Sequence, residues 1–220
     1  RGKCEADLCS CSINRSSGSN VAVQGGASAS LQDCKCNDGG ECGLSVSGSG
    51  SSAYACATGF SNCHHSNVNA QGGGKVELHD CQCVCTTYWP FPRSGLYVSG
   101  CGSSATARSS SSSYSRSSHN VAVEEGASAS LHDCVSKFSS VCGLSVKGSG
   151  STAIATGCDI SNNQDNNIAA QAGAKVEVHK CQGNRSKGGG GLYGDSNSFA
   201  RAIGCDISNN QHSNSTAQAS

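Results

Sequence analysis

The sequence predicts an all-β protein that folds as a parallel β-solenoid, in which short strands wind around a narrow core and stack coil on coil. The first observation is a long repeat, because NVAVQGGASASLQDC (20–34) returns as NVAVEEGASASLHDC (120–134). Likewise NVNAQGGGKVELHDC (67–81) returns as NIAAQAGAKVEVHKC (167–181). The second is a shorter repeat of about 24 residues, and the third is an alternation of apolar and polar residues within each unit.

An Asn or a Gly marks the start of each short unit. Alternations such as VAV or LSV follow the marker, and after a Gly-rich corner comes a second alternation such as ASASL or KVELH. Period two indicates strands with one buried face, so each unit forms one coil. We expect roughly nine coils in a rod on the order of 45 Å long. The markers are Asn20, Gly43, Asn67, Gly95, Asn120, Gly143, Asn167, Gly191 and Asn214, at steps of 23 to 28 residues.

Over residues 20–220 this pattern resembles the right-handed parallel β-helix of the pectin-lyase-like superfamily. The Gly-, Ser- and Cys-rich composition is also similar to that of large extracellular β-helix proteins of green algae. The resemblance implies right-handed coiling. We divide the chain into a partial cysteine-rich coil or cap (1–19), a first four-coil block (20–119) and a second four-coil block (120–220) that continues past the end.

Composition indicates the compartment and the partners. The hydrophobic fraction of 35% is low for a globule but suits a narrow solenoid core, and 15 basic residues balance 15 acidic ones. We therefore expect no nucleic-acid partner and no membrane insertion. A chain without Met that begins at Arg1 suggests a piece of a longer protein. Seventeen cysteines and three glycosylation sequons, at Asn14, Asn184 and Asn214, predict an extracellular or cell-surface protein.

The cysteines divide into a regular column and a dense group. Twelve of the seventeen lie before residue 102. The column ends the second strand of six units and predicts an inward ladder of small buried side chains. Its members are Cys34, Cys81, Cys134, Cys158, Cys181 and Cys205.

Disulfides are a further expectation for the cysteines. Residues stacked about 4.8 Å apart fall within the Cα separation of a disulfide, roughly 4.4–6.8 Å. The same spacing of eight in Cys34…Cys42 and Cys134…Cys142 predicts one staple in each loop. The alternative is a metal site at the CxC motifs or at Cys63-His64-His65. Paired CxxC spacing is missing, so we predict no metal and no cofactor. The remaining disulfide candidates are Cys9, Cys11, Cys36, Cys81, Cys83 and Cys85.

Enzymatic cleavage of polysaccharides is the first functional alternative, because lyases and hydrolases share the resembled fold. The Gly-His-Gly and Arg-Ile-Lys segments of a galacturonase-type site are missing. Asp33, Asp80 and Asp133 precede the cysteine column, where Asp commonly caps a turn. Glu77 and Glu177 each lie between a Lys and a His, in a pattern typical of a solvated surface. We therefore predict no catalytic residues and no enzyme activity.

Ice binding is the second alternative, since a solenoid can present the same small hydroxyl residue in every coil. The first-strand column that should face outward is of mixed size, which argues against an ice-matching array. It reads Ala22, Ser45, Asn69, Tyr97, Ala122, Ser145, Ala169 and Tyr193.

Two segments interrupt the repeat. The insertion TTYWPFPR (86–93) holds the only Trp and both prolines. We predict an interaction site there, at Tyr88, Trp89, Phe91 and Arg93, the alternative being that its aromatic rings cover the side of the solenoid. The stretch SSATARSSSSSYSRSS (103–118) predicts a mobile polar loop.

Together these features predict a non-enzymatic structural or adhesive segment of a larger secreted, matrix or filament protein. Its expected partners are another protein, further copies of itself, or glycans.

Overall fold

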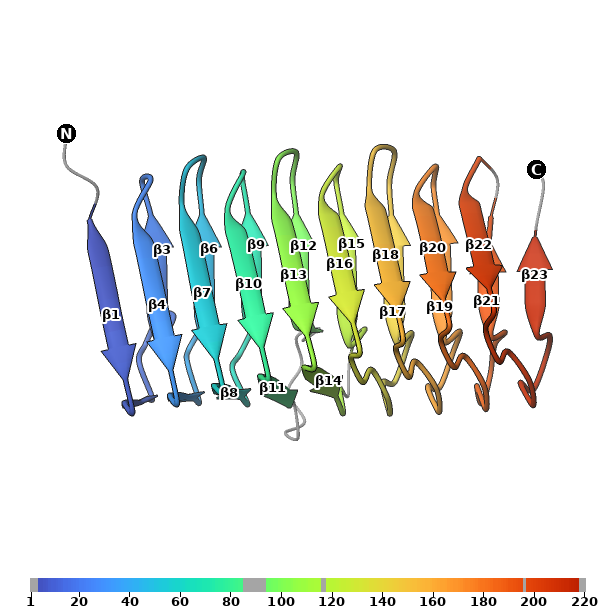
Figure 1. Ribbon diagram of the computed structural model, residues 1–220, viewed down its shortest axis with the longest axis horizontal. Helices are drawn as coiled ribbons and strands as arrows, with labels where there is room; N and C mark the ends of the chain where they lie inside the picture. Colours follow the sequence, from blue (N-terminus) through green and yellow to red (C-terminus); the bar gives the residue numbers. More distant parts are fainter. Residues whose placement is uncertain (1–3, 85–93, 116–117, 196, 218–220) are drawn as a thin grey trace.

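The computed structural model describes residues 4–84, 94–115, 118–195 and 197–217, and these residues form strands and turns without an α-helix. The strands stack into a straight rod with the two termini at opposite ends (Figure 1). Every strand pairs in parallel with the strand one coil away. The predicted parallel β-solenoid is confirmed, and right-handed coiling stays a prediction. Two of its sheets contain nine strands each, so the rod makes about eight full turns.

Sheet A is formed by the second alternation of each unit. All nine strands have five residues, and they pair without a shift in register. The strands are β1 (Glu5–Cys9), β4 (Ser28–Gln32), β7 (Ser52–Cys56), β10 (Lys75–His79), β13 (Ser104–Arg108), β16 (Ser128–His132), β18 (Thr152–Thr156), β20 (Lys175–His179) and β22 (Phe199–Ile203).

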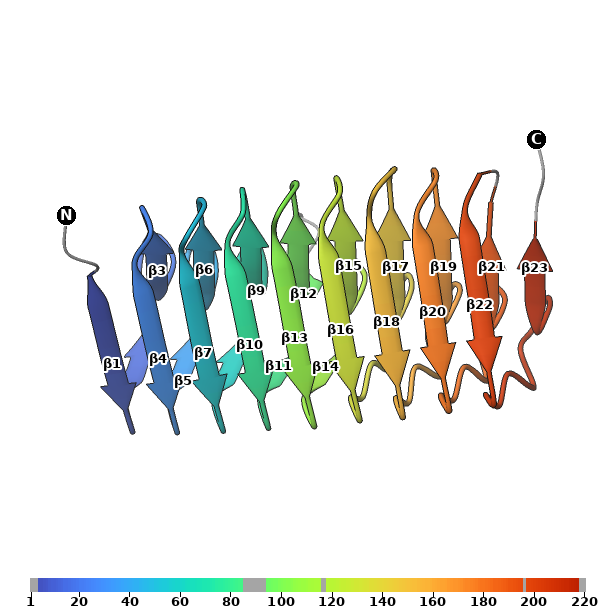
Figure 2. The ribbon, with the colours of Figure 1, turned by 45° about the horizontal axis from the view of Figure 1, so that its top comes forward.

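Sheet C is formed by the alternation after each Asn or Gly marker, and it lies behind sheet A (Figure 2). The strands are β3 (Val21–Gln24), β6 (Leu44–Ser47), β9 (Ser66–Gln71), β12 (Ser94–Ser99), β15 (Val121–Glu124), β17 (Leu144–Lys147), β19 (Ile168–Gln171), β21 (Leu192–Gly194) and β23 (Ser215–Ala217).

Sheet B is shorter and is confined to the first half of the rod. Beyond it, single bridges continue the same ladder from Ser111 through Val135, Asp159 and Gln182 to Asp206. The five strands are β2 (Ser12–Asn14), β5 (Lys35–Asn37), β8 (Gly59–Ser61), β11 (Gln82–Val84) and β14 (Ser111–Ser113).

The core is a narrow column of small and medium side chains. In sheet A the second and fourth residues of each inner strand point inward, as with Ala29 and Leu31 in β4 or Val76 and Leu78 in β10. Burying a leucine stabilises the fold by about 2 kcal/mol relative to leaving it exposed. A single coil cannot cover these side chains, so each coil depends on its neighbours.

The corner between sheets A and B explains the repeated aspartates. Asp33, Asp80 and Asp133 all have a φ of 52°, and Gly157 and Gly204 occupy the same place in later coils. Asp and Gly tolerate this left-handed backbone better than most residues. The predicted position of these aspartates at a turn is confirmed. Their capping of the turn stays a prediction, because Ala57, Ser109 and Lys180 adopt the same backbone conformation in other coils.

The Asn and Gly markers have complementary roles. Asn120 is fully buried, and its Nδ2 donates to the carbonyl of Lys137 (2.8 Å) and to Oδ1 of Asn163 (3.5 Å), which lies two coils onward. That second bond passes the intervening coil at Gly143. A Cβ there would lie 2.5 Å from Nδ2 of Asn163, so the position must be glycine. The structural repeat is therefore two coils.

Two expectations for the surface are wrong. The segment 103–118 contains strands β13 and β14, because Ala105, Ala107 and Ser112 are small enough to be buried in the narrow core. Part of the first-strand column expected to face outward is buried as well. Ala122 and Ala169 are 2% and 0% exposed, and each is paired with a tyrosine of the adjacent strand, Tyr97 and Tyr193 respectively.

Candidate binding surfaces

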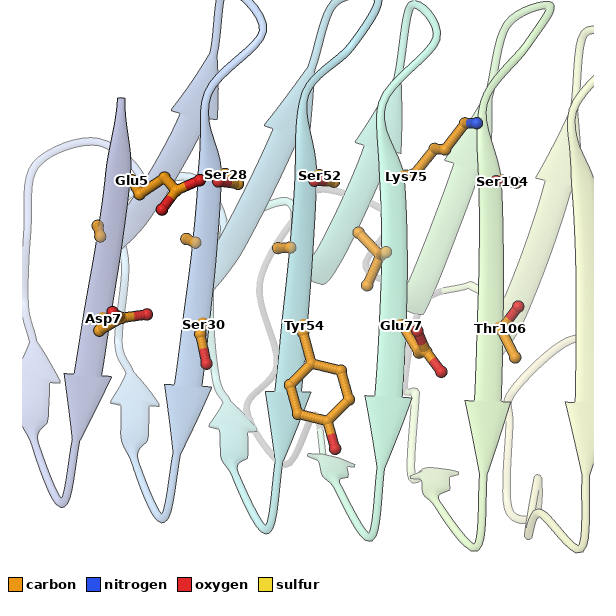
Figure 3. Close-up of a pocket in the computed structure, with 14 residues that line it drawn as sticks. Glu5, Asp7, Ser28, Ser30, Ser52, Tyr54, Lys75, Glu77, Ser104 and Thr106 are labelled. Atoms are coloured by element: carbon orange, nitrogen blue, oxygen red, sulfur yellow. The ribbon is translucent and has the colours of Figure 1, made fainter. Parts of the chain in front are cut away.

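An open groove of about 530 Å³ crosses the outward face of sheet A in the first half of the rod (Figure 3). Strand period two directs the first and third residues of each strand outward, and five adjacent strands contribute to the groove. Its polar lining residues are Glu5, Asp7, Ser28, Ser30, Ser52, Tyr54, Lys75, Glu77, Ser104 and Thr106.

Tyr54 supplies the aromatic ring of this groove. Its side chain is 40% exposed, and its ring centroid lies 5.3 Å from that of His79 at a tilt of 40°. His79 is held in turn by Glu77, because its Nε2 lies 2.8 Å from the carboxylate Oε1. The outward position predicted for the Lys-Glu-His pattern is confirmed, and the pattern positions an exposed aromatic ring.

The groove combines an aromatic face with hydroxyl groups, carboxylates and one ammonium group. Hydroxyls both donate and accept hydrogen bonds, and aromatic side chains provide rigid apolar contact area. The groove can therefore bind a polyhydroxylated ligand.

A second groove, of about 570 Å³, lies on the outward face of sheet C. Tyr97 Oη donates to Oε2 of Glu124 across 3.1 Å, and burial raises the pKa of Tyr97. Oδ1 of Asn69 is buried without a hydrogen-bond partner. Sequence reasoning found Asn69 and Tyr97 only as members of a surface column. The other lining residues include Glu41, Cys42, His65, Ser94, His119 and Glu124.

His119 lines this second groove. Burial lowers its pKa, and its Nδ1 accepts a hydrogen bond from the backbone N–H of Cys142 at 3.2 Å. A neutral imidazole is required to accept that bond. His119 therefore fixes a corner in its neutral form.

The cysteine column is confirmed as an inward ladder, with five members buried and Cys205, in the last coil, only partly buried. Cys134 shows the pattern, since its thiol donates to the carbonyl of His132 (3.2 Å) and to that of Ala107 one coil earlier (3.3 Å). The backbone N–H of each member donates to the sulfur of the next at 3.4 Å, from Cys134 through Cys158 and Cys181 to Cys205. Contact with the Cys158 thiol lowers the pKa of Cys181 to about 7.

Two ladder positions hold hydroxyl residues that sequence reasoning missed. Thr58 Oγ1 accepts from the backbone N–H of Cys34 (3.4 Å), and Ser110 Oγ accepts from that of Cys81 (3.1 Å). Both hydroxyls donate to the carbonyl two residues earlier, as the thiols do. The position requires a small side chain that can donate and accept, and alignment of the strand ends would have revealed it.

The predicted disulfide staples are not formed in the structure, where every described cysteine is a free thiol. Cys34 follows sheet A, whereas Cys42 precedes sheet C and lines the second groove. Cys134 and Cys142 are divided in the same way. The other disulfide candidates within the described residues are Cys9, Cys11, Cys36, Cys81 and Cys83, and their oxidation stays a prediction. Cys85 lies outside the described residues.

Metal binding by the cysteine motifs receives no geometric support. Among the described residues, no group of three or more His, Cys, Asp or Glu side chains could hold a metal ion. The thiols of Cys11, Cys34 and Cys63 lie close enough to Cys36 to affect its ionisation. Burial first, and these thiols second, raise the pKa of Cys36 to about 12.

The predicted interaction loop, with Tyr88, Trp89, Phe91 and Arg93, lies outside the described residues. The sequons are placed on different surfaces. Asn14 is exposed in β2, whereas Asn184 is half-buried and donates to Asp206 at 3.0 Å. Asn214 accepts from the backbone N–H of Asn210 at 3.5 Å. Their glycosylation stays a prediction.

The aspartates considered for catalysis do not come together. Ala57 separates Asp33 from Asp80 in the corner column, and Ser109 separates Asp80 from Asp133. Adjacent acidic residues, as a calcium-dependent lyase site would need, are therefore not formed at this corner.

Comparisons with known proteins find a distant structural similarity. No family model matches it, and no curated protein matches it. Among solved structures it is similar to a mutant of the periplasmic alginate epimerase AlgG, with a TM-score of 0.40 and 9% sequence identity. The match covers 81% of this chain and 61% of that one, so the chain spans less than two thirds of the epimerase. In the residues that the structure describes, no helix has the length and apolar character to cross a membrane.

Proposed function

We propose that this chain is a non-enzymatic structural or adhesive segment of an extracellular solenoid protein, and that the sheet A groove holds a polysaccharide. The observation that carries the proposal is the groove itself, which crosses five stacked strands and places Tyr54 among hydroxyl and charged side chains. A groove that runs along stacked strands repeats the same spacing from coil to coil, which suits an extended polymer.

The scaffold supports an adhesive role. Each coil is held by both neighbours through continuous ladders, so the rod keeps the groove residues in fixed register. Binding by preorganised side chains loses less conformational entropy than binding by mobile ones. Seventeen cysteines support the extracellular setting.

The direct test is Tyr54→Ala, measured by affinity electrophoresis in gels that contain xylan, mannan, soluble cellulose derivatives or polygalacturonate. Loss of an exposed aromatic contact should weaken binding about tenfold, which corresponds to about 1.4 kcal/mol. The matched control is Ile154→Ala, because Ile154 is 47% exposed at the equivalent position of β18. If Tyr54→Ala and Ile154→Ala are retarded equally, or if neither is retarded, the sheet A groove is not the polysaccharide site.

The non-enzymatic part is tested separately with polygalacturonate, with and without added calcium. We expect no new reducing ends and no absorbance from unsaturated products. Turnover that is abolished by Asp33→Asn, Asp80→Asn or Asp133→Asn would replace the structural role with a lyase activity.

A further inference from the structure

The corner that follows sheet B contains a second column of residues with left-handed backbone. Asp38, Asn62 and Asn162 occupy it with φ values of 54°, 56° and 60°. These residue types adopt such a conformation readily because their short polar side chains bond locally. The same column contains Tyr114 and Phe138 with φ values of 64° and 60°. A bulky aromatic residue at positive φ is a genuine outlier.

Neither aromatic residue serves the core. Tyr114 and Phe138 are each 46% exposed, and their rings stack on each other with centroids 5.0 Å apart and planes 20° from parallel. Positive φ belongs to this corner in other coils too, since Arg15 and Arg185 adopt it at 59° each, but in two adjacent coils the residue at the corner is an exposed aromatic ring. Strain of this kind, once observed, is a reason to look for a function.

The ring pair borders a small polar pocket of about 250 Å³ that extends over the following coils. Oγ of Ser140 is buried there without a hydrogen-bond partner. Asn162 and Gln164 contribute amide groups from the next coil. Lys187, one coil further, is the one charged residue of the lining. The full lining is Tyr114, Phe138, Ser139, Ser140, Asn162, Gln164 and Lys187.

We propose that this pocket binds one sugar ring that carries an acidic group, as part of a uronic-acid oligosaccharide. The C–H face of a pyranose would stack on the aromatic pair, which supplies a rigid apolar surface. The two amides can bond the sugar hydroxyls, and Lys187 can pair with the carboxylate. The pocket is smaller than those that hold drug-sized ligands, which favours a single ring over a peptide segment.

This site is independent of the sheet A groove, since none of its lining residues belongs to that groove. Tyr54→Ala should therefore leave it intact, and the two sites can fail separately.

The decisive variants are Tyr114→Asn and Phe138→Asn, because Asn62 and Asn162 show that asparagine fits this corner. We expect an unchanged or raised melting temperature together with at least tenfold weaker binding of trigalacturonate, measured by calorimetry and by saturation-transfer NMR. Asp38→Asn, in the same column but away from the pocket, is the matched control and should change neither quantity.

Lys187→Gln tests the choice of an acidic sugar. The variant should reduce the preference for trigalacturonate over a neutral galactotriose by about fivefold, with neutral binding retained. Equal affinity of the wild type for both sugars would overturn the assignment of an acidic ligand.

Four outcomes would overturn the site as a whole. The first is no trigalacturonate binding by the wild type, and the second is unaltered trigalacturonate binding in both asparagine variants. The third is a melting temperature that falls by several degrees in these variants, which would show that the rings stabilise the fold. The fourth is binding of a proline-rich peptide in place of the oligosaccharide, with the same loss in both variants.

Discussion

The segments 52–79 and 152–179 occupy equivalent places in the two halves of the chain, and one of the outward positions at which they differ holds Tyr54 in the first and Ile154 in the second. Both contain two sheet A strands in the same register, in which Tyr54 pairs with Glu77 and Ile154 with Glu177. The neighbouring Ser, Thr and Lys side chains also correspond. Since stacking accepts either residue at this exposed place, the fold does not require the aromatic ring of Tyr54. The two segments therefore share a scaffold, and under the proposed function the Tyr54 groove would bind a ligand that the second half does not.

The interior of the two copies diverges as well. At position 63 a buried Cys donates its backbone N–H to Asn67 Oδ1 at 3.3 Å. At position 163 a buried Asn makes the same backbone bond to Asn167 at 3.2 Å, and its side chain takes part in four further hydrogen bonds. One coil geometry is thus supported by thiols in the first half and by amides in the second.

The largest expected effect is a difference in thiol reactivity after reduction. Cys4, Cys9 and Cys101 in the first half are exposed, whereas Cys158 and Cys181 in the second half are buried. Buried thiols react through opening of the structure, so we expect them to react about a thousandfold more slowly than exposed ones. Mass spectrometry after timed alkylation measures both rates. Fast native alkylation of Cys158 and Cys181 would contradict the inward ladder.

The second largest expected effect concerns the buried position that holds Cys63 in the first half and Asn163 in the second. Asn163→Ala leaves the backbone N–H of Ser139 without its side-chain acceptor and removes one of the two acceptors of Asn120 Nδ2. The free energy of unfolding should therefore fall by about 3 kcal/mol. Cys63→Ala removes one small apolar group and should cost about 1 kcal/mol. Urea denaturation of the two variants measures the difference. Equal losses would show that the amide network is no more important than the thiol packing.

The third prediction transfers the binding residue between the copies. Ile154→Tyr places a ring beside Glu177 and His179, whose side chains lie 3.6 Å apart. We expect it to restore about tenfold in polysaccharide affinity to Tyr54→Ile, an effect of about 1.4 kcal/mol. Affinity electrophoresis of the single and double variants gives the answer. Failure to restore binding would locate the specificity in Glu5 and Asp7, which have no acidic counterparts in the second copy.

The smallest effect is a pH dependence of stability. The folded pKa of Cys36, about 12, exceeds its ordinary value of 9.0. Below pH 9 the thiol is protonated in both states, and as pH rises further the unfolded state ionises first, so stability is lost between pH 9 and 12. The equivalent position in the second half holds Ser136, which does not ionise in this range and so causes no such loss of stability. Cys36→Ser should reduce the fall in unfolding free energy between pH 8 and pH 10 by about 1.4 kcal/mol. An unchanged fall would contradict this.

The sequence predicts the architecture because stacking acts locally and repeatedly. Alternation in ASASL and KVELH determines which side chains face inward, and the cysteine column follows from the same register. The grooves could not be predicted in this way, since they depend on which outward residues become neighbours. Phe138 shows the limit most clearly, because its sequence neighbourhood gives no sign of positive φ or of contact with Tyr114, 24 positions earlier.

The bond from Asn120 to Asn163 passes over the coil of Gly143, and a similar bond joins Asn167 to Asn210 past Gly191 at 3.0 Å. Coils that begin with asparagine therefore alternate with coils that begin with glycine. Duplication or loss of one coil would break this alternation, because two asparagine coils or two glycine coils would become neighbours. Duplication or loss of two coils keeps the alternation. We therefore expect natural or engineered length variants of this solenoid to differ by even numbers of coils.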